Sequence, residues 1–141
     1  MIIVPYQAEH LLSMQIQMAQ RGVAPFITAE YAKSLEGHAI SALVDGECLA
    51  VGGIAKIWEH RGVAWSIIDV RAGAHFLTIH KACVKLLDEA PFRRIEADVA
   101  CTFEAGHRWL RMLGFKLEAP RMAAFGVDGS DSALYARVKH G

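Results

Sequence analysis

Apolar and polar positions recur with two different periods along the chain, and each period predicts one kind of element. The odd-numbered residues from Ile95 to Cys101 are apolar and their neighbours are mostly more polar, which is typical of a strand with one buried face. From residue 103 to 113 the apolar residues recur at steps of three and four, which places them on one face of a helix. We expect Thr102 to cap this helix and Gly114 to end it in a left-handed conformation. Residues 94–115 therefore predict a strand, an amphipathic helix and the beginning of another strand.

The same periods predict the elements before and after this stretch. Asp45-Gly46 is a strong hairpin signal, Gly52-Gly53 indicates a bulge or a close backbone approach, and Thr28 is expected to cap a short helix. The predicted strands are residues 2–4, 39–44, 48–57, 63–70, 95–101, 115–117, 121–127 and 133–138, and the predicted helices are residues 7–20, 29–35, 74–90 and 103–113. Because short turns join the three strands between residues 39 and 70, we expect them to be antiparallel neighbours.

Composition restricts the classes of protein that this chain represents. Its 141 residues are 53% hydrophobic and 21% charged, which predicts one globular domain over residues 1–141. The formal net charge is zero, so no basic field would gather nucleic acid or a membrane surface, and no apolar run approaches the length of a membrane span. Cys48, Cys83 and Cys101 lack metal-binding spacing, which predicts reduced thiols in a cytoplasmic protein and no metal site.

The end of the predicted 103–113 helix carries a resemblance to a known family. Its sequence from residue 109, Trp-Leu-Arg-Met-Leu-Gly-Phe, resembles the last helix of the GCN5-related N-acetyltransferases, which commonly read Asn-x-x-Ala-x-x-Leu-Tyr-x-x-x-Gly-Phe. The predicted element order, β-α-α-β-β-β-α-β-α-β-β, is also the order of that family. The resemblance implies an α/β protein with a mixed sheet whose central strands splay apart to admit acetyl-CoA. Strand 63–68 would then run parallel to strand 95–101 and diverge from it, leaving a V-shaped opening.

The resemblance also implies a cofactor-binding turn. In this family the strand before the long helix leads into a loop that resembles Arg/Gln-x-x-Gly-x-Gly/Ala, whose backbone amides and helix N-terminus hold the cofactor pyrophosphate. Residues 70–75 keep an arginine and one glycine but are one residue shorter and lack the second glycine. The residues expected to bind acetyl-CoA are Ile67, Ile68, Val70, Arg71, Gly73, Ala74 and His75. The alternative is a plain tight turn between a strand and a helix.

Direct transfer of an acetyl group to an amine needs a general base. The resemblance places family bases on the splayed central strands, and the candidates there are Asp69, Glu59 and His60. Glu59 and His60 are alternatively solvated turn residues, and Asp69 is alternatively a cap for the following helix.

The family's acid is missing at its usual position. The family tyrosine falls on Leu110, which has no proton to donate, and the family asparagine falls on Phe103. Cys101 and Tyr135 would substitute for that acid if the fold brings them close, whereas Trp109 and Leu110 are expected to pack in the core. His107, Arg108 and Arg111 form a basic helical patch that is interpreted as a solvated face.

Two functions follow from these residues. The first is an acetyl-CoA-dependent N-acetyltransferase that acts on the primary amine of a small molecule or peptide. The alternative is a non-catalytic protein that keeps the fold and acts in assembly or protein binding. Small acetyltransferase-like proteins of tailed phages and prophages are similar to this chain in compact length, in a reduced cofactor loop and in an aromatic-Leu pair, here Trp109-Leu110, and several are associated with virion assembly.

Overall fold

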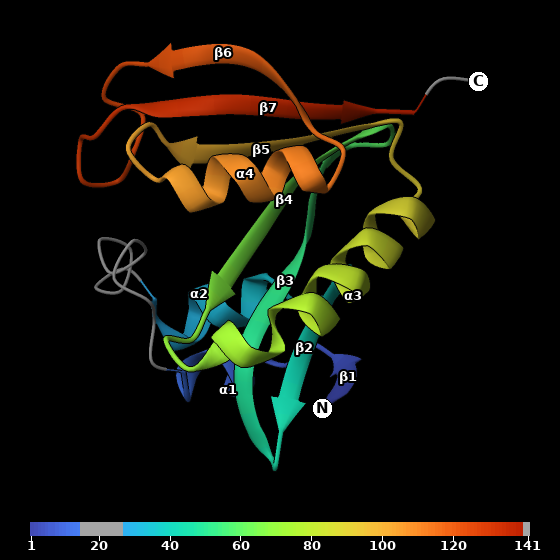
Figure 1. Ribbon diagram of the computed structural model, residues 1–141. Helices are drawn as coiled ribbons and strands as arrows, with labels where there is room; N and C mark the ends of the chain where they lie inside the picture. Colours follow the sequence, from blue (N-terminus) through green and yellow to red (C-terminus); the bar gives the residue numbers. More distant parts are fainter. Residues whose placement is uncertain (15–26, 140–141) are drawn as a thin grey trace. The chain divides into compact units, whose positions relative to one another are not determined.

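The computed structural model describes residues 1–14 and 27–139, which form a mixed sheet with helices in the predicted order (Figure 1). The sheet has seven strands in the order β1-β2-β3-β4-β5-β7-β6. The strands are β1 (Ile2–Pro5), β2 (Ala39–Val44), β3 (Glu47–Trp58), β4 (Arg61–Ile68), β5 (Arg94–Ala100), β6 (Lys116–Met122) and β7 (Ser132–Val138). The helices are α1 (Ala8–Leu12), α2 (Ala29–Ser34), α3 (Phe76–Glu89) and α4 (Glu104–Met112), and a 3-10 turn (Ala72–His75) precedes α3. No helix in the described part of the chain is long and apolar enough to span a membrane.

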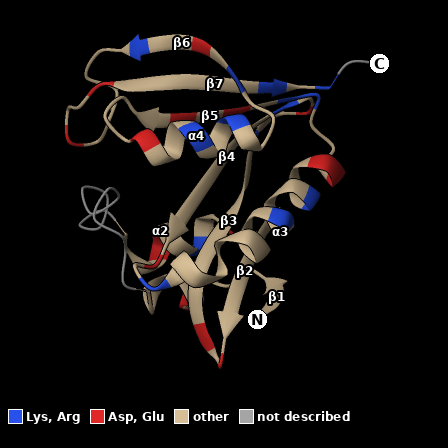
Figure 2. Ribbon diagram, viewed as in Figure 1, with Lys and Arg blue, Asp and Glu red and all other residues tan. Residues whose placement is uncertain are grey.

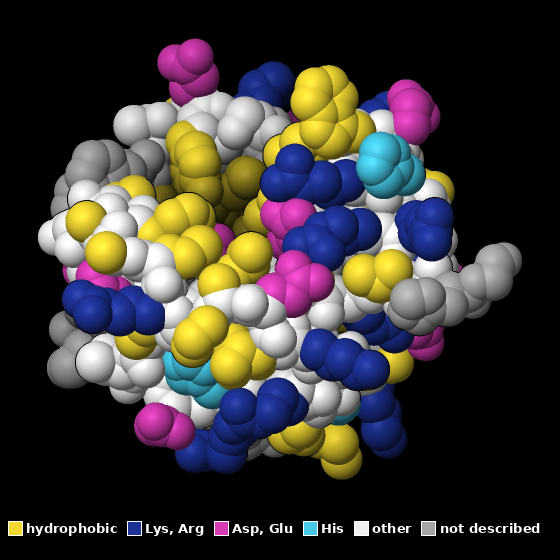
Figure 3. All heavy atoms as spheres, turned by 90° about the horizontal axis from the view of Figure 1, so that it is seen from above, with side chains coloured by type: hydrophobic (Ala, Val, Ile, Leu, Met, Phe, Trp, Pro, Cys, Tyr) yellow, Lys and Arg dark blue, Asp and Glu magenta, His cyan; other side chains and the backbone are white. Residues whose placement is uncertain are grey.

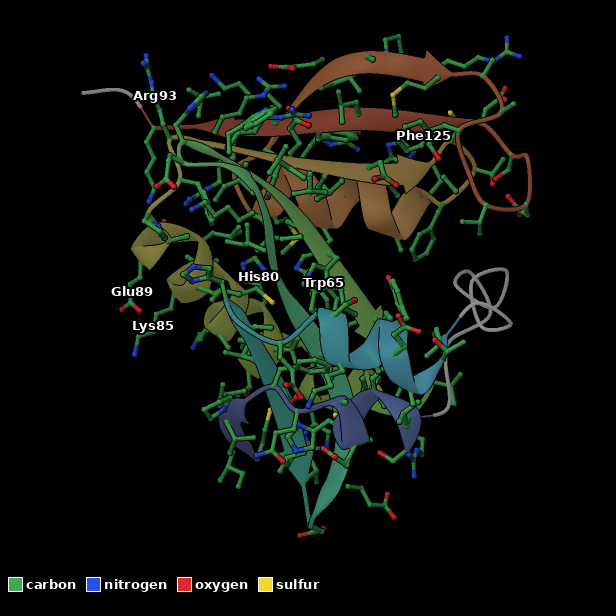
Figure 4. The ribbon with its side chains drawn as sticks, turned by 180° about the vertical axis from the view of Figure 1, so that it is seen from behind. Trp65, His80, Lys85, Glu89, Arg93 and Phe125 are labelled. Carbon is green, nitrogen blue, oxygen red and sulfur yellow. The ribbon has the colours of Figure 1, made fainter. Side chains whose placement is uncertain are left out.

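The chain divides into two compact units, residues 1–55 with 65–90 and residues 56–64 with 91–141. In the first unit, β1, β2 and β3 pair antiparallel, and their buried residues pack with those of α1 and α2 around Tyr6, Leu11 and Ala32. The Tyr6 hydroxyl donates to the carbonyl oxygen of Ala32 at 2.6 Å, and burial raises its pKa to about 12. Lys85 and Glu89 are exposed and lie on the outward side of α3 (Figure 4).

In the second unit, α4 lies along one face of the sheet formed by β5, β7 and β6. The register of β5 with β7 is unbroken from Arg94 opposite Val138 to Ala100 opposite Ser132. Gly106 of α4 sits against Val99 so closely that a Cβ on it would lie 2.6 Å from a Val99 methyl carbon. The odd-numbered residues of β5 therefore face α4, as the alternation in the sequence predicted.

The expected parallel neighbour relation between β4 and β5 is confirmed at the start of both strands. Arg61 lies opposite Arg94, Gly62 opposite Ile95 and Val63 opposite Glu96. These three pairs all belong to the second unit, and the described register ends with them. The V-shaped opening expected beyond them concerns the placement of one unit against the other and stays a prediction.

Several local signals are confirmed. Asp45 and Gly46 have φ of 50° and 81° in the β2–β3 turn, and the Thr28 hydroxyl accepts from the Tyr31 amide at 3.1 Å as a helix cap. Gly114 has a φ of 91°. Gly53 marks a close approach, because a Cβ there would lie 2.6 Å from the Cβ of Ala39.

Several boundary predictions are wrong. The predicted helix 7–20 is observed as α1 (Ala8–Leu12), which ends at the capping residue Ser13, and positions 15–20 of the prediction lie outside the described residues. Thr102 does not cap α4: the capping position is Phe103, without a side-chain bond. A single strand, β6 (Lys116–Met122), replaces the two predicted strands 115–117 and 121–127, because β7 pairs along it and an edge strand tolerates Pro120. Residues 123–127 lie outside any strand. The long helix begins at Phe76 because a 3-10 turn takes the preceding four residues.

Replacing Gly114 by alanine should lower the free energy of unfolding by about 1 kcal/mol, because a Cβ is disfavoured at positive φ. Gly73→Ala is the matched control, since Gly73 has no positive φ and no atom would lie within 4 Å of its added Cβ. Urea unfolding of both variants measures the difference. Equal midpoints for the two variants would contradict the left-handed helix stop.

Candidate functional site

The turn after β4 is built around the buried carboxylate of Asp69. Its side chain is fully covered, and its amide donates to the carbonyl oxygen of Leu49 at 2.8 Å. The carboxylate accepts from the Arg71 amide at 2.9 Å and from Nε and Nη2 of the Arg71 guanidinium, each at 2.8 Å. Because a buried carboxylate is stable only when it is paired and hydrogen-bonded, this contact holds the turn in shape. The geometry favours the helix-entry role of Asp69 over that of a base.

Arg71 is engaged by a second carboxylate. Its Nη1 donates to Oε2 of Glu47 at 2.7 Å, so three of its nitrogens face acidic groups. The hydrogen bonds that Arg71 donates to Asp69 are the main cause that raises the pKa of Arg71. Counting Asp69 and Glu47 as −2 and Arg71 as +1, the trio has a formal charge of −1. The arginine predicted to touch phosphate therefore brings no uncompensated charge to the turn.

The backbone at Gly73 is open. Nothing would lie within 4 Å of a Cβ added there, and Gly73 does not have a positive φ, so neither the conformation nor the packing of the turn requires glycine. Gly73 lies in the 3-10 turn that leads into the 14-residue helix α3, whose capping residue His75 makes no side-chain cap bond. No acidic residue lies in the first turn of α3, and its charged residues lie in later turns (Figure 2).

An anionic group fits this backbone. A helix N-terminus without a side-chain cap presents amides and a partial positive charge, and an open glycine lets a phosphate approach the chain. Val70 and Ala74 are exposed here and His75 is half-buried, whereas Ile67 is buried in the core and Ile68 is half-buried. Of the seven predicted cofactor residues, those from Val70 to His75 lie in one surface turn, and Ile67 belongs to the hydrophobic core.

Glu59 and His60 lie together in the β3–β4 turn of the second unit. The Glu59 side chain is 92% exposed and accepts from Nζ of Lys56 at 2.6 Å, a bond that lowers its pKa. His60 is exposed, and its carbonyl oxygen accepts from the Arg94 amide at 2.9 Å. Both residues have the features of the solvated turn that was the alternative reading.

A histidine and a tyrosine in the second unit form a contact that the sequence did not predict. Nδ1 of His107 lies 2.7 Å from the Tyr135 hydroxyl, and its Nε2 lies 3.2 Å from the carbonyl oxygens of both Ala100 and Cys101. Carbonyls only accept, so Nε2 carries the proton and the Tyr135 hydroxyl donates to Nδ1. Arg111 donates to the same hydroxyl at 3.3 Å. The predicted solvated face is therefore wrong for His107, which is half-buried.

The contact between His107 and Tyr135 bears on whether Tyr135 could replace the tyrosine acid that the family has at the position of Leu110. Tyr135 is 1% exposed and its hydroxyl proton points to His107, while the Cys101 thiol lies 3.5 Å from the carbonyl oxygen of Pro120. Trp109 and Leu110 are half-buried rather than core residues. Neither Tyr135 nor Cys101 offers an unengaged proton in this structure. The sequence signal that could have indicated this shared contact is the spacing of His107 and Arg111, which lie one helical turn apart.

Four charged residues cross-link β4, β5 and β6 in the second unit. Glu96 accepts from Arg61 at 2.8 and 2.9 Å and from Arg94 at 2.7 Å, and Arg94 also contacts Glu118 at 2.6 and 3.0 Å. Figure 3 shows acidic and basic side chains lying next to one another in the view from above. The bond from Arg61 is the main cause that lowers the pKa of Glu96, and the bond from Arg94 lowers that of Glu118.

Solved structures of acetyltransferases match the chain from end to end. The GNAT-family acetyltransferase of Streptococcus pneumoniae is 14% identical with a TM-score of 0.68, and 99% of each chain is covered. Ard1 of Thermoplasma volcanium is 14% identical with a TM-score of 0.72, covering 99% of this chain and 98% of that one. The ribosomal-protein-alanine N-acetyltransferase of Brucella melitensis is 11% identical with a TM-score of 0.68, covering 99% and 100%.

Sequence comparison adds no relative. No protein-family model matches the chain, and neither does any curated protein sequence. At identities this low, the structural matches bear on the fold and not on the substrate. The chain has the fold of the GCN5-related N-acetyltransferases.

Replacing Glu96 by glutamine should destabilise the protein at pH 7 by about 1–3 kcal/mol, because two arginines lose a charged acceptor. The folded pKa of Glu96 is lowered from its ordinary 4.5, so its contribution is complete above that value and is lost as the pH falls below it. Melting temperatures of wild type and variant should therefore converge at acid pH. Glu59→Gln is the control and should leave the melting temperature unchanged at pH 7, because its ion pair is exposed. A pH-independent gap between wild type and Glu96→Gln would contradict the charge network.

Proposed function

We propose that this chain is an acetyl-CoA-dependent N-acetyltransferase that acetylates a primary amine. The end-to-end likeness to acetyltransferases carries the proposal, since 99% of this chain and 98–100% of theirs are covered. The open, uncapped turn before α3 supports it, because that turn offers backbone amides to an anion. Fold alone does not establish activity, so the proposal rests on the turn as well.

The residues that would hold acetyl-CoA are those of the turn and the strand before it. Gly73, Ala74 and His75 would face its pyrophosphate, and the half-buried Ile68 and the exposed Val70 would line the approach. Arg71 would contribute only by exchanging its contact with Glu47, which is exposed, for a phosphate. When bound, acetyl-CoA supplies the acetyl group as an activated thioester. The chain's own part is to position the amine and to remove its proton.

The acceptor is proposed to be the amine of a peptide, protein or small molecule. The names of two matched structures describe acetylation of ribosomal-protein alanine, in Brucella melitensis and, for protein S5, in Vibrio fischeri. Those names apply to those proteins, and they make an N-terminal alanine a reasonable first acceptor to examine. Spermidine and a lysine-containing peptide represent other amine classes.

The second candidate is a non-catalytic protein with this fold that acts in assembly or binding. Two observations favour it. Leu110 stands where the family acid is expected, and the Tyr135 hydroxyl is engaged by His107. Arg71 is already neutralised by two carboxylates. A phage or prophage origin of such a protein stays a prediction.

Calorimetry with acetyl-CoA separates the two candidates. Wild type should bind, and Gly73→Asp should bind at least tenfold more weakly, because the new carboxylate repels the pyrophosphate and fills its approach. Gly73→Ala is the matched control without a charge and should retain most of the affinity. No binding by wild type at millimolar acetyl-CoA would favour the non-catalytic candidate. Binding by wild type followed by turnover of an alanine-initiated peptide, a lysine-containing peptide or spermidine would support the enzyme.

Removing the Glu47 carboxylate should strengthen acetyl-CoA binding, because Arg71 would then keep one guanidinium nitrogen for a phosphate. We expect Glu47→Gln to lower the dissociation constant by up to about fivefold, a modest effect because the pair is solvent-exposed. Salt should reduce the gain. Glu89→Gln, which removes an exposed carboxylate at the far end of α3, is the control for general charge. An unchanged affinity in Glu47→Gln would show that Arg71 does not contact the cofactor.

A further inference from the structure

β1 is one of the two edge strands of the sheet, and its outer side carries exposed apolar residues. Among the described strands it pairs with β2 alone, from Ile2 opposite Leu43 to Pro5 opposite Ile40 (Figure 1). Ile2 is 60% exposed and Ile3 is 39% exposed, although both side chains are large and apolar. An edge strand presents a row of unpaired N–H and C=O groups to any other strand. β1 is therefore a place at which further strand pairing can begin.

One backbone hydrogen bond identifies which groups of β1 point outward. The Tyr6 amide donates to the carbonyl oxygen of Ala39 at 3.1 Å, and this pair continues the β1–β2 register by one residue. In an antiparallel pair, alternate residues direct both their N–H and their C=O to the same neighbouring strand. Val4 thus points these groups to β2, whereas Ile3 and Pro5 point theirs to the open side. The missing N–H of proline removes no bond to β2 at such a position.

The other edge strand, β6, carries features that prevent strand pairing. It contains Lys116, Glu118, Pro120 and Arg121, and its register with β7 shifts at two points. Charges, proline and bulges are means by which proteins protect a sheet edge. Residues 1–6 include no charged side chain, their one proline lies at the end of β1, and the β1–β2 register has no shift. The sheet therefore has one protected edge and one unprotected edge.

We propose that the β1 edge binds the β1 edge of a second copy of this chain, in antiparallel pairing around a two-fold axis. With Ile3 opposite Ile3 of the second copy, each Ile3 donates its outward N–H to the carbonyl oxygen of the other. Ile2 then lies opposite Val4 of the second copy. Met1 lies opposite Pro5, whose carbonyl oxygen faces outward and can accept. Every cross-strand pair is apolar, and no pair places like-charged side chains opposite one another.

A second copy suits this edge because the strand is complementary to itself. A strand without charged side chains can lie against an identical strand without repulsion. Two-fold pairing uses the outer side of β1 in both copies, so the assembly closes at two chains, and the protected β6 edge prevents further addition of strands. Because β1 has only four residues, the contact belongs to the small, transient class and should dissociate on dilution. The pairing involves β1 alone and does not depend on acetyl-CoA.

Sedimentation equilibrium from micromolar to millimolar protein tests the pairing. Wild type should pass from monomer to dimer over this range and form no larger species. Ile3→Pro should stay monomeric throughout, because it removes the outward N–H and leaves the bonds of Val4 to β2 in place. At micromolar concentration, where wild type is also monomeric, the two proteins should have similar melting temperatures. That comparison separates loss of the dimer from loss of the fold.

An exchange of charges at residue 3 tests the register. Ile3→Lys and Ile3→Glu should each be monomeric, because the new charge faces its own copy across the two-fold axis. An equimolar mixture of the two variants should associate as a heterodimer, and added salt should weaken that association. Leu117→Lys is the matched control, since Leu117 is an apolar residue of the other edge strand and is 51% exposed. It should dimerise as wild type does.

Amide hydrogen exchange reports on the proposed hydrogen bonds directly. The Ile3 amide should exchange rapidly in micromolar protein and about tenfold more slowly in millimolar protein, because only the dimer protects it. The Val4 amide, which points to β2, should change little with concentration.

Three results would overturn the proposal. The first is a wild type that stays monomeric at millimolar concentration, including one whose Ile3 amide is protected at every concentration because another part of the chain covers the edge. The second is a dimer that persists in both Ile3→Pro and Ile3→Lys, which would place the contact elsewhere. The third is a mixture of Ile3→Lys and Ile3→Glu that does not associate although wild type dimerises, which would exclude the register centred on Ile3.

Discussion

The buried carboxylate of Asp69 is the interaction on which the entrance to α3 depends. A fully covered charge costs several kcal/mol to desolvate and is stable only with a partner of opposite charge and hydrogen bonds to both oxygens. Arg71, two residues later, supplies both the opposite charge and the hydrogen bonds. The chain therefore turns directly after Asp69. The turn leads without a linker into the 3-10 segment and α3. The fit of an anion at Gly73 is a consequence of that geometry.

The same interaction limits what the turn offers a cofactor. An arginine that stabilises a buried carboxylate and also contacts Glu47 is not available to a phosphate without cost. If acetyl-CoA binds as proposed, the turn would hold its pyrophosphate with backbone amides and the helix N-terminus, which act over a short range and favour anions by modest amounts. Arg71 is present in the turn, but its charge is already paired with Asp69 and Glu47.

In the second unit, charge pairing and strand pairing reinforce one another. Glu96 joins Arg61 of β4 to Arg94 of β5 where those strands are in register, and Arg94 reaches Glu118 of β6. On the other face of β5, Tyr135 and His107 connect β7 to α4. Four acidic residues of this unit, Glu59, Glu96, Glu118 and Asp131, form ion pairs with basic side chains.

The sequence by itself determined the order of the elements and their local ends. Periods of 2 and 3.6 depend only on which residues are apolar, and Asp45-Gly46, Thr28 and Gly114 act through their own backbone conformations, so these predictions needed no tertiary information. The C-terminal strand boundaries failed because pairing with β7, not local propensity, extends β6 through Pro120.

Only the tertiary structure decided which side chains meet. Arg71 and Glu47 are 24 residues apart, His107 and Tyr135 are 28 apart, and Arg61 and Glu96 are 35 apart. Each pairing depends on strand register and on the face to which a side chain points. A shift of one residue reverses that face, so no local pattern reveals it. For that reason the sequence nominated Asp69 from its place after a strand, while only the structure shows that its carboxylate is paired with Arg71.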